Sequence, residues 1–374
     1  MKRRIVWLLL SSLVVLSLVL ASCAPAPTTP KAPTAPAAPT APTTPSTPTT
    51  PSTPTTPLAP AVEKPKYGGT LTVAIPSNQR GFSPTASGTI TSSLYTLHFT
   101  NDGLWAGDWA KGPAGTNETD FLNWTWGLDL GTPMLAESWE LPGDNTLIYH
   151  LRKGIRYSLD PKNEASRLVN GRELTAADVV YSINAMYFDP ESFGQYERIP
   201  EERPLSVEAI DKYTVKIKYN PGMTSSIVYS TSTYSYMFPP EVYEKYNKMR
   251  DWKHAVGTGG FILTDVLSGS SMTMMRSPNG WWKKDPVGSG KGNQLPYVDS
   301  IKMLIIGDRS TQMAAFRTGK LDVLGAPVNI YLDDFELLMK QRPDLQWVKW
   351  PPRASTLVSL RVDKPCGQAG TALV

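Results

Sequence analysis

Cysteine and histidine are scarce in this sequence: its 374 residues include 2 cysteines and 3 histidines. The histidines, His98, His150 and His254, show neither an HExxH pattern nor another spacing typical of metal ligands. A metal site is therefore unsupported, and we expect neither a metal nor another cofactor.

Motifs of common catalytic sites are missing as well. No serine stands in a GxSxG turn, and the loop from Gly288 to Gly292 lacks the first glycine and the Ser/Thr of a phosphate loop. Asp333-Asp334 and the acidic stretch 191–208 supply carboxylates, but sequence neighbours point in different directions, so we interpret both as solvated surface. We expect no catalytic residue and no enzyme.

The charge balance argues against a nucleic-acid-binding protein. The formal net charge is only +4, and no cluster of lysine and arginine alternates with aromatic residues, so nucleic acid is not an expected partner. Aromatic residues are plentiful, with 11 Trp and 16 Tyr, and no internal repeat of solenoid period is present.

The N-terminus predicts export. Three basic residues at positions 2–4 precede an apolar run from Ile5 to Leu20, which is shorter than the roughly 20 residues that span a bilayer. Residues 1–22 therefore have the pattern of a signal peptide, and Leu20-Ala21-Ser22-Cys23 resembles the bacterial lipobox. That motif implies lipidation of Cys23, which leaves Cys366 without a partner and excludes a disulfide framework.

Residues 23–66 consist almost entirely of Pro, Thr, Ala and Ser and predict an extended linker. At ~3.1 Å per residue such a linker reaches on the order of 130 Å from the membrane. The part from Tyr67 onward is long enough for one large or two medium domains with a sizeable core.

Periodicity in the remaining chain predicts mixed α and β structure. Thr175 to Asp178 forms a capping box that opens a helix, and a second helix is expected over 310–318, ending at Gly319. Alternating residues predict strands at 70–75, 146–151, two strands over 207–219, a hairpin of 260–266 with 272–276, and strands at 298–306 and 321–324. The predicted class is α/β, or α+β, with a mixed sheet.

A series of motifs in a fixed order carries a family resemblance. The motifs are GGTLTVA at 68–74, LAESW at 135–139, HLRKG at 150–154, NGRELTAADVVYS at 170–182, GTGGF at 257–261, RSPNGWW at 276–282, LPYVD at 295–299 and FRTGKLD at 316–322. Together they resemble family 5 of the bacterial extracellular solute-binding proteins, the oligopeptide-, dipeptide- and nickel-binding components of ABC transporters. The resemblance covers about Tyr67 to Asp363.

This resemblance implies a two-lobed fold of the periplasmic-binding-protein type (type II) that closes on a ligand by hinge motion. Lobe I is expected over 67–325, with an extra subdomain inserted at about 86–204, and lobe II over 326–374. After Pro365 the sequence CGQAGTALV departs from the family pattern. We therefore expect lobe II to be truncated, the chain to be incomplete, and this chain alone not to bind ligand tightly.

Candidate ligand-binding residues are Thr89, Tyr196, Thr258 and Gly259. The glycines around Thr258 permit close backbone approach, either by a ligand or at the entry of a strand, and both alternatives stay open. For Thr89 and Tyr196 the alternative is a packed or surface residue.

The family resemblance implies a binding protein that captures peptides for the permease of an ABC importer, and the lipobox adds a lipid anchor at the membrane outside the cytoplasm; we expect a monomer. Oligosaccharides are the second ligand class, because Trp105, Trp109, Trp124 and Trp126 could stack on sugar rings. A secreted enzyme acting on peptides or glycans is the remaining alternative, for which we find no catalytic constellation.

Overall fold

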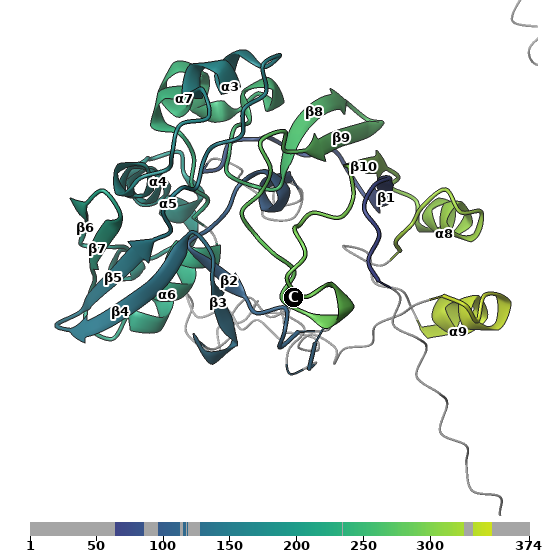
Figure 1. Cartoon of the computed structure of the whole chain (residues 1–374), viewed down its shortest axis with the longest axis horizontal. Helices are drawn as coiled ribbons and strands as arrows, with labels where there is room; N and C mark the ends of the chain where they lie inside the picture. Colours follow the sequence, from purple (N-terminus) through teal and green to yellow (C-terminus); the bar gives the residue numbers. More distant parts are fainter. Residues whose placement is uncertain are drawn as a thin grey trace, which may run out of the picture. The chain divides into compact units, whose positions relative to one another are not determined.

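The computed structural model describes residues 64–85, 96–112, 115, 116, 118, 128–233, 235–324 and 332–345. Within these residues the strands form two four-stranded sheets and one two-stranded sheet (Figure 1). No helix among them is long and apolar enough to cross a bilayer. The mixed α and β class expected from the sequence is confirmed.

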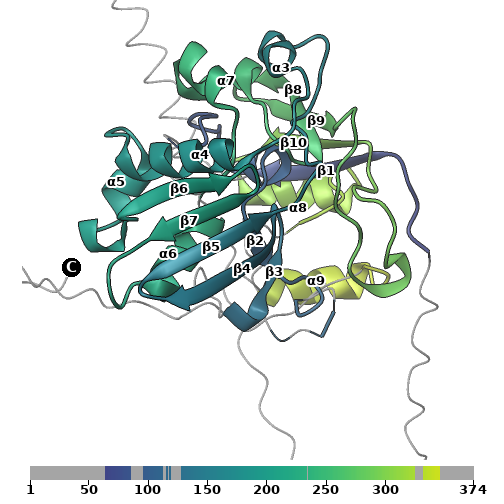
Figure 2. The same ribbon diagram turned by 60° about the vertical axis from the view of Figure 1, so that its left-hand side comes forward.

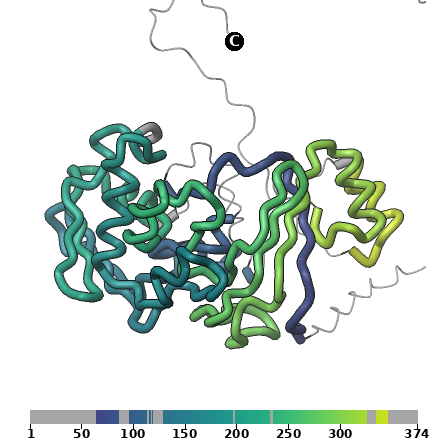
Figure 3. The backbone as a smooth tube through the Cα atoms, turned by 90° about the horizontal axis from the view of Figure 1, so that it is seen from above, coloured from purple at the N-terminus to yellow at the C-terminus, as the bar shows by residue number. Residues whose placement is uncertain are grey.

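The first sheet has the strand order β1-β10-β9-β8. Strand β1 (Thr70–Ile75) pairs in parallel with β10 (Ser300–Ile305), which is antiparallel to β9 (Ser271–Arg276); β9 forms a hairpin with β8 (Phe261–Leu267). Residues 70–75 and 300–305, which are far apart in the sequence, therefore lie side by side, as the purple and green traces in Figure 3 show. The buried core of this sheet consists of Ile75, Phe261, Leu263, Met272, Met274, Ile301 and Met303.

The second sheet is antiparallel and has the order β4-β5-β7-β6. It contains β4 (Ala136–Gly143), β5 (Thr146–Leu151), β7 (Thr214–Lys218) and β6 (Ser206–Asp211), and α4 (Ala176–Phe188) packs against β6 and β7 (Figure 2). Every second residue of β5 and β7 is apolar and points into a large core: Leu147, Tyr149, Leu151, Val215 and Ile217. The subdomain boundary expected near residue 204 falls just before β6; the expected domain boundaries stay a prediction.

Helix α4 begins where the capping box predicted. The Thr175 backbone N–H and hydroxyl both donate to Asp178 Oδ2, at 2.8 and 3.1 Å. Arg172 forms ion pairs with Asp178 and with Glu241 at 2.6 and 2.7 Å and stacks over the ring of Tyr157. The start of α4 is thus tied to α7 (Pro240–Lys245), a helix later in the chain.

The other elements connect these sheets. The helices are α3 (Glu164–Val169), α5 (Phe193–Glu197), α6 (Thr224–Thr233), α8 (Arg309–Arg317) and α9 (Leu332–Gln341), and β2 (Trp105–Gly107) pairs with β3 (Gly131–Pro133). Short 3-10 turns are η1 (Leu128–Leu130), η2 (Pro200–Glu202), η3 (Asn247–Met249), η4 (Trp252–His254) and η5 (Gly288–Gly290).

One expected strand is much shorter than predicted. In place of a strand over 321–324, a single bridge joins Val323 to Val73. The Asp322 carboxylate accepts a hydrogen bond from the Thr72 backbone N–H at 2.6 Å. In a longer strand pair this N–H would donate to a backbone carbonyl of the neighbouring strand. The other strands expected from alternation, and both expected helices, are confirmed to within about two residues.

Candidate ligand-binding site

The glycine-rich run 257–260 is buried against the segment 99–101. The Gly259 backbone N–H donates to the Thr100 carbonyl at 2.9 Å. A Cβ atom at Gly259 would lie 2.4 Å from the Phe99 carbonyl oxygen, and one at Gly257 2.1 Å from that of Thr100. In this structure the chain's own backbone makes the close approach that these glycines permit.

A buried carboxylate, Asp102, is the centre of the neighbouring polar contacts. Its Oδ2 accepts hydrogen bonds from Thr258 Oγ1 at 3.0 Å and from the indole nitrogens of Trp281 and Trp282 at 3.2 and 3.4 Å. Burial raises the pKa of Asp102, and the three donors act in the opposite direction. Asp102 therefore holds together three segments that are far apart in the sequence.

Trp282 also forms one wall of a small cavity of about 150 Å³. The other walls include Trp109, Pro133 and Pro286, and Lys283, Lys284 and Asp108 contribute charge. Trp109 is 51% exposed, and Lys283 is half-buried. The cavity thus combines aromatic walls with an excess of positive charge.

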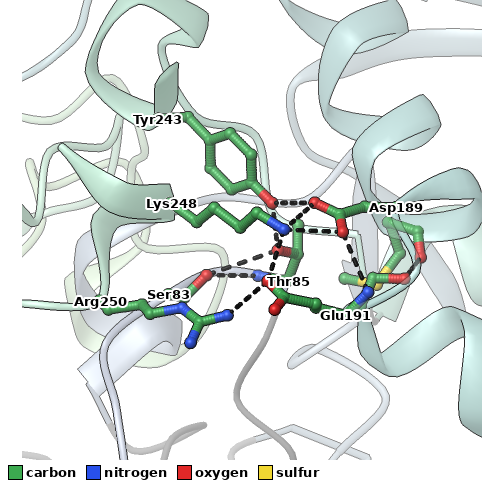
Figure 4. A network of polar contacts seen from close by, with 9 residues as sticks. Ser83, Thr85, Asp189, Glu191, Tyr243, Lys248 and Arg250 are labelled. Carbon is green, nitrogen blue, oxygen red and sulfur yellow. Dashed lines mark hydrogen bonds and ion pairs between the residues drawn. The ribbon is translucent and has the colours of Figure 1, made fainter. Parts of the chain in front are cut away.

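A second polar network lies at the end of α4 (Figure 4). The Tyr243 hydroxyl contacts Thr85 Oγ1 at 2.7 Å and donates to Asp189 Oδ2 at 3.1 Å. Lys248 pairs with Asp189 and with Glu191, at 2.8 and 2.6 Å. Burial raises the pKa of Tyr243 to about 12, so its hydroxyl remains protonated and can donate.

Lys248 belongs to an unusual backbone turn. Asn247, Lys248 and Met249 have φ values of 47°, 58° and 57°, in the left-handed region that costs roughly 1–2 kcal/mol per non-glycine residue. The ion pairs of Lys248 and the complete burial of Met249 offset this strain. The network therefore holds a conformation that the local sequence disfavours.

A shallow groove of about 700 Å³ lies beside this network. It shares Tyr243 and Asp189 with the network, and its other walls are largely apolar: Ala177, Val180, Tyr181, Ala185, Pro190 and Ala209.

The four candidate ligand-binding residues lie in different surroundings, and the structure does not describe all of them. Thr258 is buried in the contacts of Asp102, and Gly259 lies against the segment 99–101. Tyr196 belongs to α5, and the Phe193 N–H of that helix donates to the Thr85 carbonyl at 2.8 Å. The side chain of Tyr196, the whole of Thr89 and the proposed lipidation site Cys23 lie outside the described residues. Contact of these residues with a ligand stays a prediction.

The tryptophans proposed to stack on sugars differ from one another. Trp105 is buried in the core, where its indole nitrogen donates to the Val228 carbonyl at 3.0 Å and its ring contacts Trp139. Trp109 lines the cavity, and Trp124 and Trp126 lie outside the described residues. Trp105 is therefore a core residue in this structure.

Sequence reasoning missed Asp102 and Lys283. Asp102 has no signal of its own in the sequence, because it lies about 150 residues before Thr258 and about 180 before Trp282. Lys283 directly follows the RSPNGWW motif, and its position next to that motif is the signal that could have pointed to it. Among the described residues no three His, Cys, Asp or Glu side chains gather as metal ligands would.

Comparison with known proteins defines the class. Residues 132–366 match the family described as "Bacterial extracellular solute-binding proteins, family 5 Middle", and the chain belongs to this family. The family is extracellular, so the protein acts outside the cytoplasmic membrane. Its members are binding proteins of ABC transporters.

Individual relatives are distant. The periplasmic oligopeptide-binding protein OppA of Escherichia coli is 24% identical over 232 residues, which cover 57% of this chain and 38% of OppA. DppA from Helicobacter pylori, solved with the peptide STSA, has a TM-score of 0.55 and 20% identity and covers 74% of this chain and 49% of its own. AppA from Bacillus subtilis, solved with a nonapeptide, has a TM-score of 0.54 and 20% identity, with coverage of 74% and 47%.

These likenesses establish the two-lobed periplasmic-binding-protein fold. The chain spans about a third to two fifths of the curated relatives' length and about half of the solved structures. The expected truncation of lobe II stays a prediction.

Proposed function

We propose that this protein is the substrate-binding lipoprotein of an ABC importer, and that it captures oligopeptides or dipeptides and delivers them to a membrane permease. The observation that carries the proposal is the family match over 132–366, joined to structural neighbours solved with bound peptides. The cavity beside Trp282 combines apolar walls with a few charged groups, as ligand sites do, and its volume of about 150 Å³ is enough for one chemical group of a ligand.

We further propose that the protein is monomeric and is held at the outer face of the cytoplasmic membrane by a lipid on Cys23. Leu20-Ala21-Ser22-Cys23 supports this anchoring, and the Pro/Thr-rich linker would lift the binding domain from the surface. Replacing Cys23 with Ser should move the protein from membranes into the soluble fraction. Retention after an alkaline wash would show that the apolar leader is a retained membrane helix.

The ligand class is tested on the full-length natural protein. Mass spectrometry of whatever co-purifies with it should identify short peptides, and calorimetry with a peptide library should show saturable binding without cleavage of the peptides. Cleaved peptides would overturn the proposal in favour of an enzyme.

Oligosaccharides are the second candidate ligands, and one observation favours them. Trp109 is 51% exposed and lines the cavity together with charged side chains, a combination that suits stacking on a sugar ring. Co-purification of a glycan in place of peptides would support this class.

A further inference from the structure

Lys283 lacks the carboxylate partner that several other cations of the described residues have. Lys212, Lys248 and Arg276 each pair with a carboxylate at 2.6 to 2.8 Å. The Lys283 ammonium is half-buried at the cavity, and among the described residues no carboxylate lies within ion-pair distance of it. The ammonium lies over the ring of Trp281, whose centroid is 5.6 Å away.

The two carboxylates whose charges act on Lys283 already accept hydrogen bonds from other groups. Asp102 Oδ2 already accepts from Thr258, Trp281 and Trp282, and Asp108 Oδ1 accepts the Ala110 backbone N–H at 2.9 Å. Their charges raise the pKa of Lys283, but burial is the larger effect and lowers it. Burying a cation without a hydrogen-bonded counter-ion costs free energy. An anion bound next to Lys283 would reduce that free-energy cost.

The cavity has the size and the walls for such a group. Its volume of about 150 Å³ is several times the roughly 30 Å³ that one water occupies in the liquid. The rings of Trp109 and Trp282 and the prolines Pro133 and Pro286 keep part of the surroundings apolar, which strengthens an ion pair formed there. Lys284, exposed at the same cavity, adds a second positive charge.

We propose that this cavity is a subsite for a carboxylate group of the ligand, with Lys283 as its counter-ion. The inference rests on the proposed function and adds a chemical requirement to it: the captured peptide presents a carboxylate. Two sources share this chemistry, the C-terminal carboxylate of the peptide and an acidic side chain, and the experiment distinguishes them.

The test uses calorimetry on the full-length natural protein with four probes. The probes are Ala-Ala-Ala as free acid, the same tripeptide as C-terminal amide, and the amides of Ala-Asp-Ala and Ala-Asn-Ala. We expect one acid of a matched pair to bind about 10- to 100-fold more tightly than its amide partner, as a charge-assisted hydrogen bond predicts. Preference within the first pair identifies the C-terminus, and preference within the second identifies a side chain.

Variants assign the preference to Lys283. Lys283→Met should abolish the difference between acid and amide, and Lys283→Arg should retain most of it because the charge remains. Lys302, exposed on β10, supplies the matched control, and Lys302→Met should leave all four affinities unchanged. Thermal melting of each variant shows that the protein is folded during the titration.

Each other outcome contradicts the proposal in a recognisable way. Equal binding of acids and amides by the natural protein overturns the carboxylate subsite and leaves peptide binding intact. A preference that survives in Lys283→Met overturns the role of Lys283. Binding of no peptide, with a glycan retained instead, overturns the proposed peptide function and the subsite together.

Discussion

Thr258 donates a hydrogen bond to Asp102 Oδ2 across 156 residues of sequence, at a distance of 3.0 Å. Through this contact the glycine-rich run that precedes β8 is tied to the loop that precedes β2. Because Trp281 and Trp282 donate to the same oxygen, the position of Thr258 and the walls of the cavity depend on one carboxylate.

Removing that carboxylate should destabilise the protein. Asp102→Ala leaves the hydroxyl of Thr258 and two indole N–H groups without their acceptor, and each unmade buried bond costs about 1–3 kcal/mol. We expect a loss of at least about 2 kcal/mol in urea unfolding. Asp265→Ala, at an exposed position of β8, is the matched control and should change stability by less than about 0.5 kcal/mol. Equal effects of both variants would contradict the role of Asp102.

Gly259→Ala separates the two interpretations of the glycine-rich run. Since the new Cβ would meet the Phe99 carbonyl oxygen at 2.4 Å, we expect a melting temperature several degrees lower. Gly81→Ala is the control, because a Cβ there meets nothing within 4 Å, and its melting temperature should stay near that of the natural protein. A loss of ligand affinity at unchanged melting temperature would instead favour direct contact of Gly259 with the ligand.

The ionisation of Glu173 makes the stability of the fold depend on pH. Its carboxylate accepts from Lys212, from the Gly154 backbone N–H and from Tyr213, and these contacts lower its pKa from 4.5 to about 2. A carboxylate with a lower pKa in the folded state stabilises the fold above pH 4.5, and the stabilisation is lost as the pH falls toward 2.

The comparison of Glu173→Gln with the natural protein tests this. At pH 7 the variant should be less stable by about 1–2 kcal/mol, after allowance for solvent screening, and the difference should shrink steadily between pH 4.5 and pH 2. Glu137→Gln on the exposed face of β4 should show no such trend. A difference that does not vary with pH would mean that the charge of Glu173 contributes nothing.

Tyr243 links the segment that leads to Thr89 with the end of α4. Tyr243→Phe removes the hydroxyl that contacts buried Thr85 and donates to Asp189, and we expect a loss of about 1–2 kcal/mol. In Tyr246→Phe the lost bond goes to the exposed Glu164, so that change should cost less than about 0.5 kcal/mol. Denaturant unfolding of both variants measures the difference; losses of equal size would show that the buried network adds no stability.

Local patterns account for most of the elements that were predicted correctly. The alternation in TLTVAI and TLIYHL places apolar side chains on one face, and Thr175 with Asp178 satisfies the free N–H groups of a helix start. These signals act within a few residues, so they are readable in the sequence. The strand expected at 321–324 is not formed, because the Asp322 side chain pairs with the backbone of Thr72, which is distant in the sequence.

The sequence by itself determined most strands of the two four-stranded sheets, the helices α4 and α8, and the motifs that identify family 5, because each depends on neighbours along the chain. Only the tertiary structure decided that Asp102 is buried beneath Thr258 and Trp282, that Trp105 is a core residue, and that Lys283 lines a cavity. The physical reason is burial: hydrogen bonds and charges gain their strength from the removal of water, and the sequence alone does not show which side chains lose it.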